Sequence, residues 1–329
     1  MARVGDHNLN VGKEGTVGTA ATGTYRSFDV TSDSLALSID RIESDAIRSG
    51  RRVLSSTSGW AAGNKNVSGD LEMEIGSAGF GFWLENLIGS IAAPALTGTG
   101  TASVYTHTAK LGALDGKSLT IQAVRTDSAG VQKAFNYIGS KVNTFEIGAE
   151  VGSFATAKLS IDAQDEVIDT PAIQTANYTA GVPLAYTGAT VSIGGAAIAA
   201  RSFSLKGDNN LSGDRYFLGS NKKAEQVEAA MRRFEGSVAV DWKNADALYA
   251  KFTSGATATI VAKFEGPTVI GTSTTKPSLT ITLNAVRFDG TTPVGGGQII
   301  QTDVPFVVLD DAGTDTAVKM EYVSGDATP

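Results

Sequence analysis

Residues 38–89 read SIDRIESDAIRSGRRVLSSTSGWAAGNKNVSGDLEMEIGSAGFGFWLENLIG and combine three patterns in a fixed order. Residues 41–66 are polar, rich in Ser, Gly, Asn and Arg, and have little regular pattern. Residues 67–75 alternate between apolar and polar side chains, which predicts a strand with one buried face. Residues 80–88 place large apolar side chains at helical spacing between two glycines, which predicts a short helix.

The same order recurs in residues 202–255, where a polar segment again leads into an alternating strand and a short helix. The stretch GDLEME (69–74) aligns with GSVAVD (236–241), and residues 82–90 align with residues 247–255. Few residues are identical, so order and spacing carry the comparison. They indicate an internal duplication, and a length of 329 residues suits two domains.

The duplication divides the chain into an N-terminal arm, a first repeat, a linker, a second repeat and a C-terminal extension, at residues 1–27, 28–165, 166–188, 189–311 and 312–329. Both ends are made mostly of small residues with little to bury, so we expect them to extend from the fold. Residues 222–233 contain good helix formers, but the matching part of the first repeat does not, which favours an irregular loop. The remaining alternation predicts an all-β fold with one short helix per repeat.

Composition excludes several classes of protein. The net charge of −7 and the pI of about 5.0 argue against a protein that grips nucleic acid by its phosphates. The absence of Cys excludes disulfides and thiolate sites. Neither a secretory signal nor an apolar run long enough for a membrane is evident, so we expect a soluble protein made in a cytoplasm.

Catalytic patterns are weak. The only histidines, His7 and His107, cannot form a pair at metal-binding spacing. No nucleophile elbow or phosphate-binding loop is present in usable form. Glu72 and Glu74 share a strand face, but such carboxylate pairs usually only solvate a strand. We therefore predict no enzyme activity, no cofactor and no metal.

Basic side chains gather in the two long polar segments of this acidic chain: Arg48, Arg51, Arg52, Arg215, Lys222 and Lys223. They are typical of an ordinary solvated loop. Alternatively, these loops dock onto an acidic surface of another copy of the chain, where opposite charge sets the orientation. Together with the duplicated β-rich halves, the second interpretation points to an assembly protein.

The arrangement resembles the tail tube fold of bacteriophage virions. The similarity lies in a strand, a long loop with Arg residues, the Gly-led strand at 69–74 and 236–241, and the short helix, and it covers most of residues 28–311. In particular, the chain is similar to the major tail tube proteins of phages with long, non-contractile tails, in the version with two tube domains per chain.

The resemblance implies a β-sandwich or half-barrel in each repeat. Neighbouring repeats would join into a barrel around a channel, in stacked rings. Each ring would contain three chains and have pseudo-sixfold symmetry; a ring of six chains is the alternative. Such a virion protein is a structural conduit for genome ejection. Its implied partners are other copies of itself, a tape measure protein and the tail terminator and tip proteins; DNA passes without specific binding, and no membrane is involved.

The resemblance gives the polar residues roles. Glu72, Glu74 and Asp241 would face the channel and repel DNA phosphates, unless the opposite strand face lines it. The loops at 41–66 and 209–231, with the six basic residues named above, would contact the adjacent ring. The competing interpretation is a secreted or cell-surface β-rich adhesion module, which the missing signal peptide disfavours.

Overall fold

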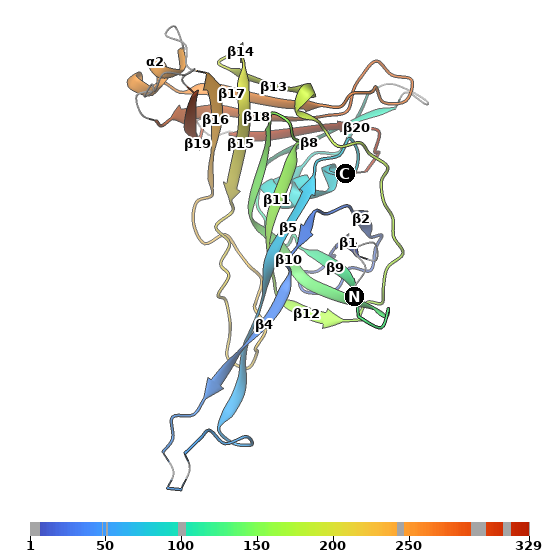
Figure 1. Ribbon diagram of the computed structural model, residues 1–329, viewed down its shortest axis with the longest axis vertical. Helices are drawn as coiled ribbons and strands as arrows, with labels where there is room; N and C mark the ends of the chain where they lie inside the picture. Colours follow the sequence, from blue (N-terminus) through green and yellow to red (C-terminus); the bar gives the residue numbers. More distant parts are fainter. Residues whose placement is uncertain are drawn as a thin grey trace.

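The computed structural model describes residues 7–47, 49–50, 52–97, 103–241, 247–290, 301–311 and 317–328. Within these ranges the protein is mostly β-sheet with two short α-helices, and the paired strands are antiparallel (Figure 1). The expected all-β fold class is confirmed.

The strands and helices of the first half are β1 (Asn8–Lys13), β2 (Arg26–Phe28), β3 (Ser32–Asp33), β4 (Ala36–Glu43), β5 (Trp60–Glu74), α1 (Gly81–Ile88), β6 (Gly89–Ile91), β7 (Ala95–Thr97), β8 (Val104–Leu111), β9 (Leu119–Thr126), β10 (Gln132–Glu150), β11 (Thr156–Ala163) and β12 (Asp165–Ile168). Those of the second half are η3 (Tyr186–Gly188), β13 (Ala189–Ile193), β14 (Ala196–Ile198), β15 (Ala200–Asp208), β16 (Arg233–Asp241), α2 (Ala247–Ser254), β17 (Ala258–Glu265), β18 (Ser278–Phe288), β19 (Gln301–Leu309) and β20 (Val318–Ser324).

The two halves order their central strands in the same way. The first half pairs β4–β5–β11–β10, and the second half pairs β15–β16–β19–β18. In each half the only α-helix among the described residues follows the second strand of this order, after β5 and after β16. The outer strands correspond as well, since β9 and β12 flank β10 as β17 and β20 flank β18.

The halves join through a direct ladder between β10 and β15, from Thr144 opposite Asp208 to Glu150 opposite Ser202. Eight strands from β4 to β18 therefore form one sheet that runs through both halves. A second contact lies between β8 and β20, which pair from Lys110 opposite Lys319 to Tyr105 opposite Ser324. Strands β6 to β8 have no counterpart after α2.

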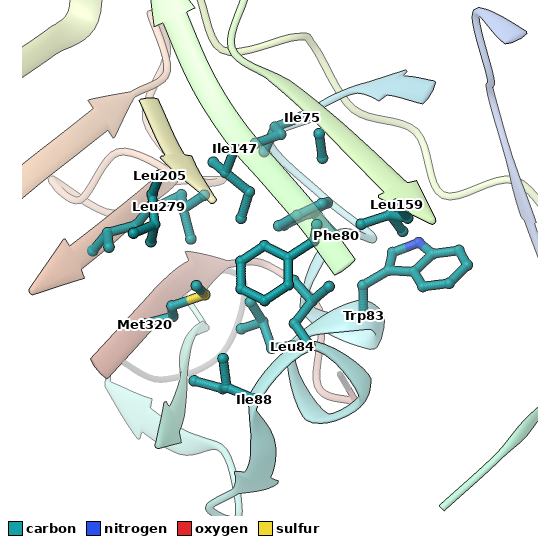
Figure 2. Close-up of a cluster of buried hydrophobic side chains, with 14 of the residues drawn as sticks. Ile75, Phe80, Trp83, Leu84, Ile88, Ile147, Leu159, Leu205, Leu279 and Met320 are labelled. Carbon is teal, nitrogen blue, oxygen red and sulfur yellow. The ribbon is translucent and has the colours of Figure 1, made fainter. Parts of the chain in front are cut away.

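One face of the joined sheet packs on an apolar core (Figure 2). Helix α1 contributes Trp83 and Leu84, and the strands contribute Ile147, Leu159 and Leu205; all five are fully buried. Each buried side chain of this size stabilises the fold by roughly 1.5–3 kcal/mol. The helix ends where expected, because Gly89 adopts φ 101°, which favours glycine.

Three expectations about irregular segments are wrong. The supposed N-terminal arm contains β1, whose Leu9 and Val11 are fully buried beside β9. The supposed C-terminal extension contains β20, whose Val318 and Tyr322 are fully buried. Both strands form because they cover edges that β9, β18 and β8 would otherwise leave open. The loop expected at residues 41–66 is too long at both ends, because β4 continues to Glu43 and β5 starts at Trp60.

The Gly that leads each aligned strand lies at a close crossing of backbones. A Cβ atom on Gly69 would lie 2.5 Å from the carbonyl oxygen of Ser34. A Cβ atom on Gly236 would overlap the carbonyl oxygen of Ser204 on β15 in the same way. Backbone atoms cannot move aside as a flexible side chain can, so only Gly fits at both positions.

We expect Gly69→Ala and Gly236→Ala each to lower the free energy of unfolding by about 2 kcal/mol, because the added methyl group overpacks against backbone. Urea denaturation measures the loss. The matched control is Gly23→Ala, since a Cβ atom there meets nothing within 4 Å. Equal stability of all three variants would contradict the close crossing.

Candidate functional site

The candidate site is the second face of the joined sheet, which we call the polar face. On β5, Leu71 and Met73 point into the core, so Asp70, Glu72 and Glu74 lie on the opposite side. Asp70 and Glu72 both contact Lys158 Nζ, each at 3.2 Å.

Strand β16 repeats this arrangement. Val238 and Val240 are buried, and Glu235 and Asp241 lie on the polar face. Asp241 forms a two-point ion pair with Arg201, with a shortest contact of 2.7 Å. Glu72, Glu74 and Asp241 therefore share one face of one sheet, as their alternation indicates. Whether this face lines a channel stays a prediction at this point.

Five charged side chains form a row across neighbouring strands. Glu72, Lys158, Glu146, Lys206 and Glu235 lie opposite one another in register, on β5, β11, β10, β15 and β16. Lys206 Nζ lies 3.5 Å from a carboxylate oxygen of Glu146. The hydrogen bonds that Lys158 donates to Glu72 and Asp70 raise the pKa of Lys158. The signs of the charges alternate along the row.

Carboxylates outnumber basic side chains on the polar face as a whole. The carboxylates are Asp70, Glu72, Glu74, Glu146, Glu150, Asp208, Glu235, Asp241 and Asp303, and the basic side chains are Lys158, Arg201, Lys206, Arg233 and Arg287. Apart from Arg201, which lies at a bulge, the strand register places them all on this face. The surface is therefore net acidic.

The segment between β15 and β16, residues 209–232, forms a strap that packs on the first half. The Asn209 side chain donates hydrogen bonds to the carbonyl oxygens of Leu87 and Val142. Lys141, almost fully buried, lies 2.7 Å from Glu225 of the strap. The strap contains no α-helix, in agreement with the irregular loop expected at residues 222–233.

The strap corrects the expectation for Lys223 and gives the exposed Lys222 a partner within the chain. Lys223 is 1% exposed and its ammonium group contacts the carboxylate of Asp162, so it has no surface to offer a neighbouring ring. Burial raises the pKa of Asp162, and this effect outweighs the opposing one of Lys223. Lys222 forms an ion pair with Asp165 at 2.5 Å within the chain. Although burial alone would raise it, Lys222 and Lys65 hold the pKa of Asp165 below its usual value.

The other predicted loop contacts fall in different places. Arg215 donates a hydrogen bond to the carbonyl oxygen of Glu225 and lies 5.9 Å from the centre of the exposed Phe217 ring. Arg52 is exposed near the tip of the β4–β5 hairpin. Arg48 and Arg51 lie outside the described residues.

The β4–β5 hairpin extends well beyond the rest of the molecule, and we call its projecting part, residues 41–62, the arm (Figure 1). Large apolar side chains are exposed along it, namely Ile42, Val53, Leu54 and Trp60. The Arg41 guanidinium lies 5.7 Å from the centre of the Trp60 ring. The sequence predicted a contact loop here but not the strands that enter it from both sides. The apolar Ile39 and Trp60 are the residues that could have indicated these strands.

A sequence model of the phage tail tube protein family matches residues 6–308. The chain belongs to the phage tail tube protein family. Its role is therefore structural, in the tail of a virion. No curated protein matches the sequence. None of the helices in the described ranges is long and apolar enough to cross a membrane, and these ranges contain no cluster of three residues suited to a metal ion.

The buried pair between strap and first half allows a test of this tail tube protein's internal junction. Lys223→Met removes the cation and leaves the Asp162 carboxylate buried, so we expect the free energy of unfolding to fall by about 3–5 kcal/mol at pH 7. The folded-state pKa of Asp162, already raised, rises further. Stability from a raised carboxyl pKa is present at low pH and lost as the pH rises through the folded-state value, so the variant recovers stability toward pH 4.

Urea denaturation at pH 7 and pH 4 measures both effects. Lys222→Met is the matched control, because its partner Asp165 keeps a second ion pair with Lys65 at 2.6 Å. The control should lose no more than about 1 kcal/mol. Equal losses in the two variants, or a loss in Lys223→Met that does not depend on pH, would contradict the assignment.

Proposed function

We propose that this chain forms rings that stack into the phage tail tube, and that the polar face lines the channel through which DNA leaves the capsid. The observation that carries the proposal is the joined sheet, in which two like units pair edge to edge with one apolar and one acidic face. We take the units as a duplication, with β1–β12 in the first and β13–β20 in the second.

The contact between copies follows from the contact between units. Within the chain, strand β15 pairs with an edge of β10. In the duplication, β15 of the second unit corresponds to β4 of the first, and β10 of the first corresponds to β18 of the second. Among the described residues, β4 pairs only with β5. Beyond Val286, the edge of β18 that faces β17 has no strand partner among the described residues. Pairing β4 of one copy with β18 of the next repeats the internal ladder and removes both open edges.

The number of chains follows from the number of units. A ring of three chains contains six units and has pseudo-sixfold symmetry. The copies contact one another head to tail. The ring therefore closes only if the rotation from one chain to the next is a third of a full turn. A negative wall around the channel repels DNA phosphates, so the genome passes without being held.

The arm supports contacts between rings. It carries exposed apolar side chains and the exposed Arg52, and apolar surface that is rimmed by charge is typical of a protein interface. The exposed Phe217 and Leu218 at the end of the strap, beside Arg215, offer a second contact. A tape measure protein inside the tube, terminator and tip proteins at its ends, and assembly in the host cytoplasm complete the proposal.

We expect the purified chain, at high concentration, to form rings and hollow tubes in negative-stain electron microscopy. Light scattering on the same sample should give mass steps of three chains. Steps of six chains would retain the tube and remove the pseudo-sixfold argument. A chain that stays monomeric even when tail-tip proteins are added would overturn the proposal.

The matched variant replaces residues 44–59 with an Asn-Gly turn, which can close the β4–β5 hairpin. The contacts within a ring do not involve these residues, so rings should form while stacking is lost. Tubes of normal length from this variant would exclude the arm as the contact between rings.

A further inference from the structure

Two lysines lie on the acidic polar face, and the proposed function does not account for them. The side chains of Lys158 and Lys206 are 49% and 58% exposed, so solvent reaches both. Lysines are the groups through which many proteins hold DNA phosphates. On the wall of a channel they would slow the genome that has to pass.

Each lysine lies between two carboxylates in register. Lys158 has Glu72 on one neighbouring strand and Glu146 on the other. Lys206 has Glu146 on one side and Glu235 on the other. Neighbouring strands lie about 4.8 Å apart, so an extended ammonium group reaches a carboxylate on either side.

We propose that carboxylates mask the two lysines: Asp70 and Glu72 pair with Lys158, Glu146 pairs with Lys206, and these ion pairs prevent both lysines from binding the phosphates of a passing duplex. The inference rests on the proposed function. It divides the acidic residues of the face into two kinds, since Asp70, Glu72 and Glu146 neutralise lysines, whereas carboxylates such as Glu74, Glu150 and Asp303 repel DNA.

The polar face offers a matched set for comparison. Glu74, Glu150 and Asp303 lie on the same face, opposite Thr156, Ser202 and Ala239 in register. In the part of the chain that the structure describes, no basic side chain faces them across a strand pair. Neutralising Asp70, Glu72 and Glu146 changes the net charge as much as neutralising this set, but only the first change exposes lysines.

The test compares two full-length triple variants, D70N/E72Q/E146Q (the row variant) and E74Q/E150Q/D303N, with the wild type as unassembled chains. Fluorescence anisotropy measures binding of a labelled duplex of about 20 bp, at about 50 and 200 mM NaCl. We expect only the row variant to bind. Its affinity should fall about tenfold between the two salt concentrations, because each of two lysine–phosphate contacts loses about threefold over this range.

Adding K158Q/K206Q to the row variant should abolish the binding. Equal binding by the two triple variants would overturn the mask, because net charge alone would then explain it. A folded row variant that binds no more tightly than the wild type would overturn it too. Thermal unfolding checks each variant, and if the row variant is unfolded, E146Q against E150Q provides the same comparison.

The outcome is independent of tube assembly, because the polar face is open in the single chain. If the wild type forms tubes but the row variant binds no DNA, the proposed masking of the lysines is contradicted and the proposed function stands. A chain that forms no rings would remove the proposed function and leave the binding comparison unchanged.

Discussion

Strand β10 is the constraint on which the rest of the structure depends, because it belongs to two sheets at once. Its first part pairs with β9 and β12, and its second part pairs with β11 and β15. The change of direction falls at Gly139, which has φ 66° and lies at a break in the ladder with β9. A residue with a side chain is strained in this conformation. The bend lets one strand close the core of the first half and still offer an edge to the second.

The two junctions of the proposed ring are therefore not equivalent. Inside the chain, the β10–β15 ladder is reinforced by the β8–β20 pair and by the buried ion pair between Lys223 and Asp162. The second half has no counterpart of β6 to β8, and the arm of the first half projects outward where the strap of the second folds back. In the proposed ring, the contact between copies would lack these reinforcements, which suits a subunit that folds first and assembles later.

Sequence patterns predicted what depends on near neighbours in the chain. Alternation placed Glu72 and Glu74 on one strand face, and the glycines after each apolar turn marked the ends of α1 and α2. The register between distant strands could not be predicted, so the roles of Lys158 and Lys206 were missed. Lys223 was misread for the same reason, because a lysine in a polar stretch is usually solvated unless a distant carboxylate such as Asp162 covers it. Strand β20 could have been predicted from the alternation of VKMEYVS, but the acidic and small residues around it obscured this pattern.

The most direct test of the account is the accessibility of the polar face in assembled tubes. The chain has no cysteine, so a single Ser237→Cys substitution on β16 reports that face alone, and Ser128→Cys on the turn after β9 serves as the reference. In the free chain, both should react with a small maleimide and with a 5-kDa polyethylene glycol maleimide. In tubes, the account predicts that Ser237→Cys still reacts with the small reagent but is protected from the large one. Equal labelling of both positions in tubes by the large reagent would place the polar face outside and contradict the account.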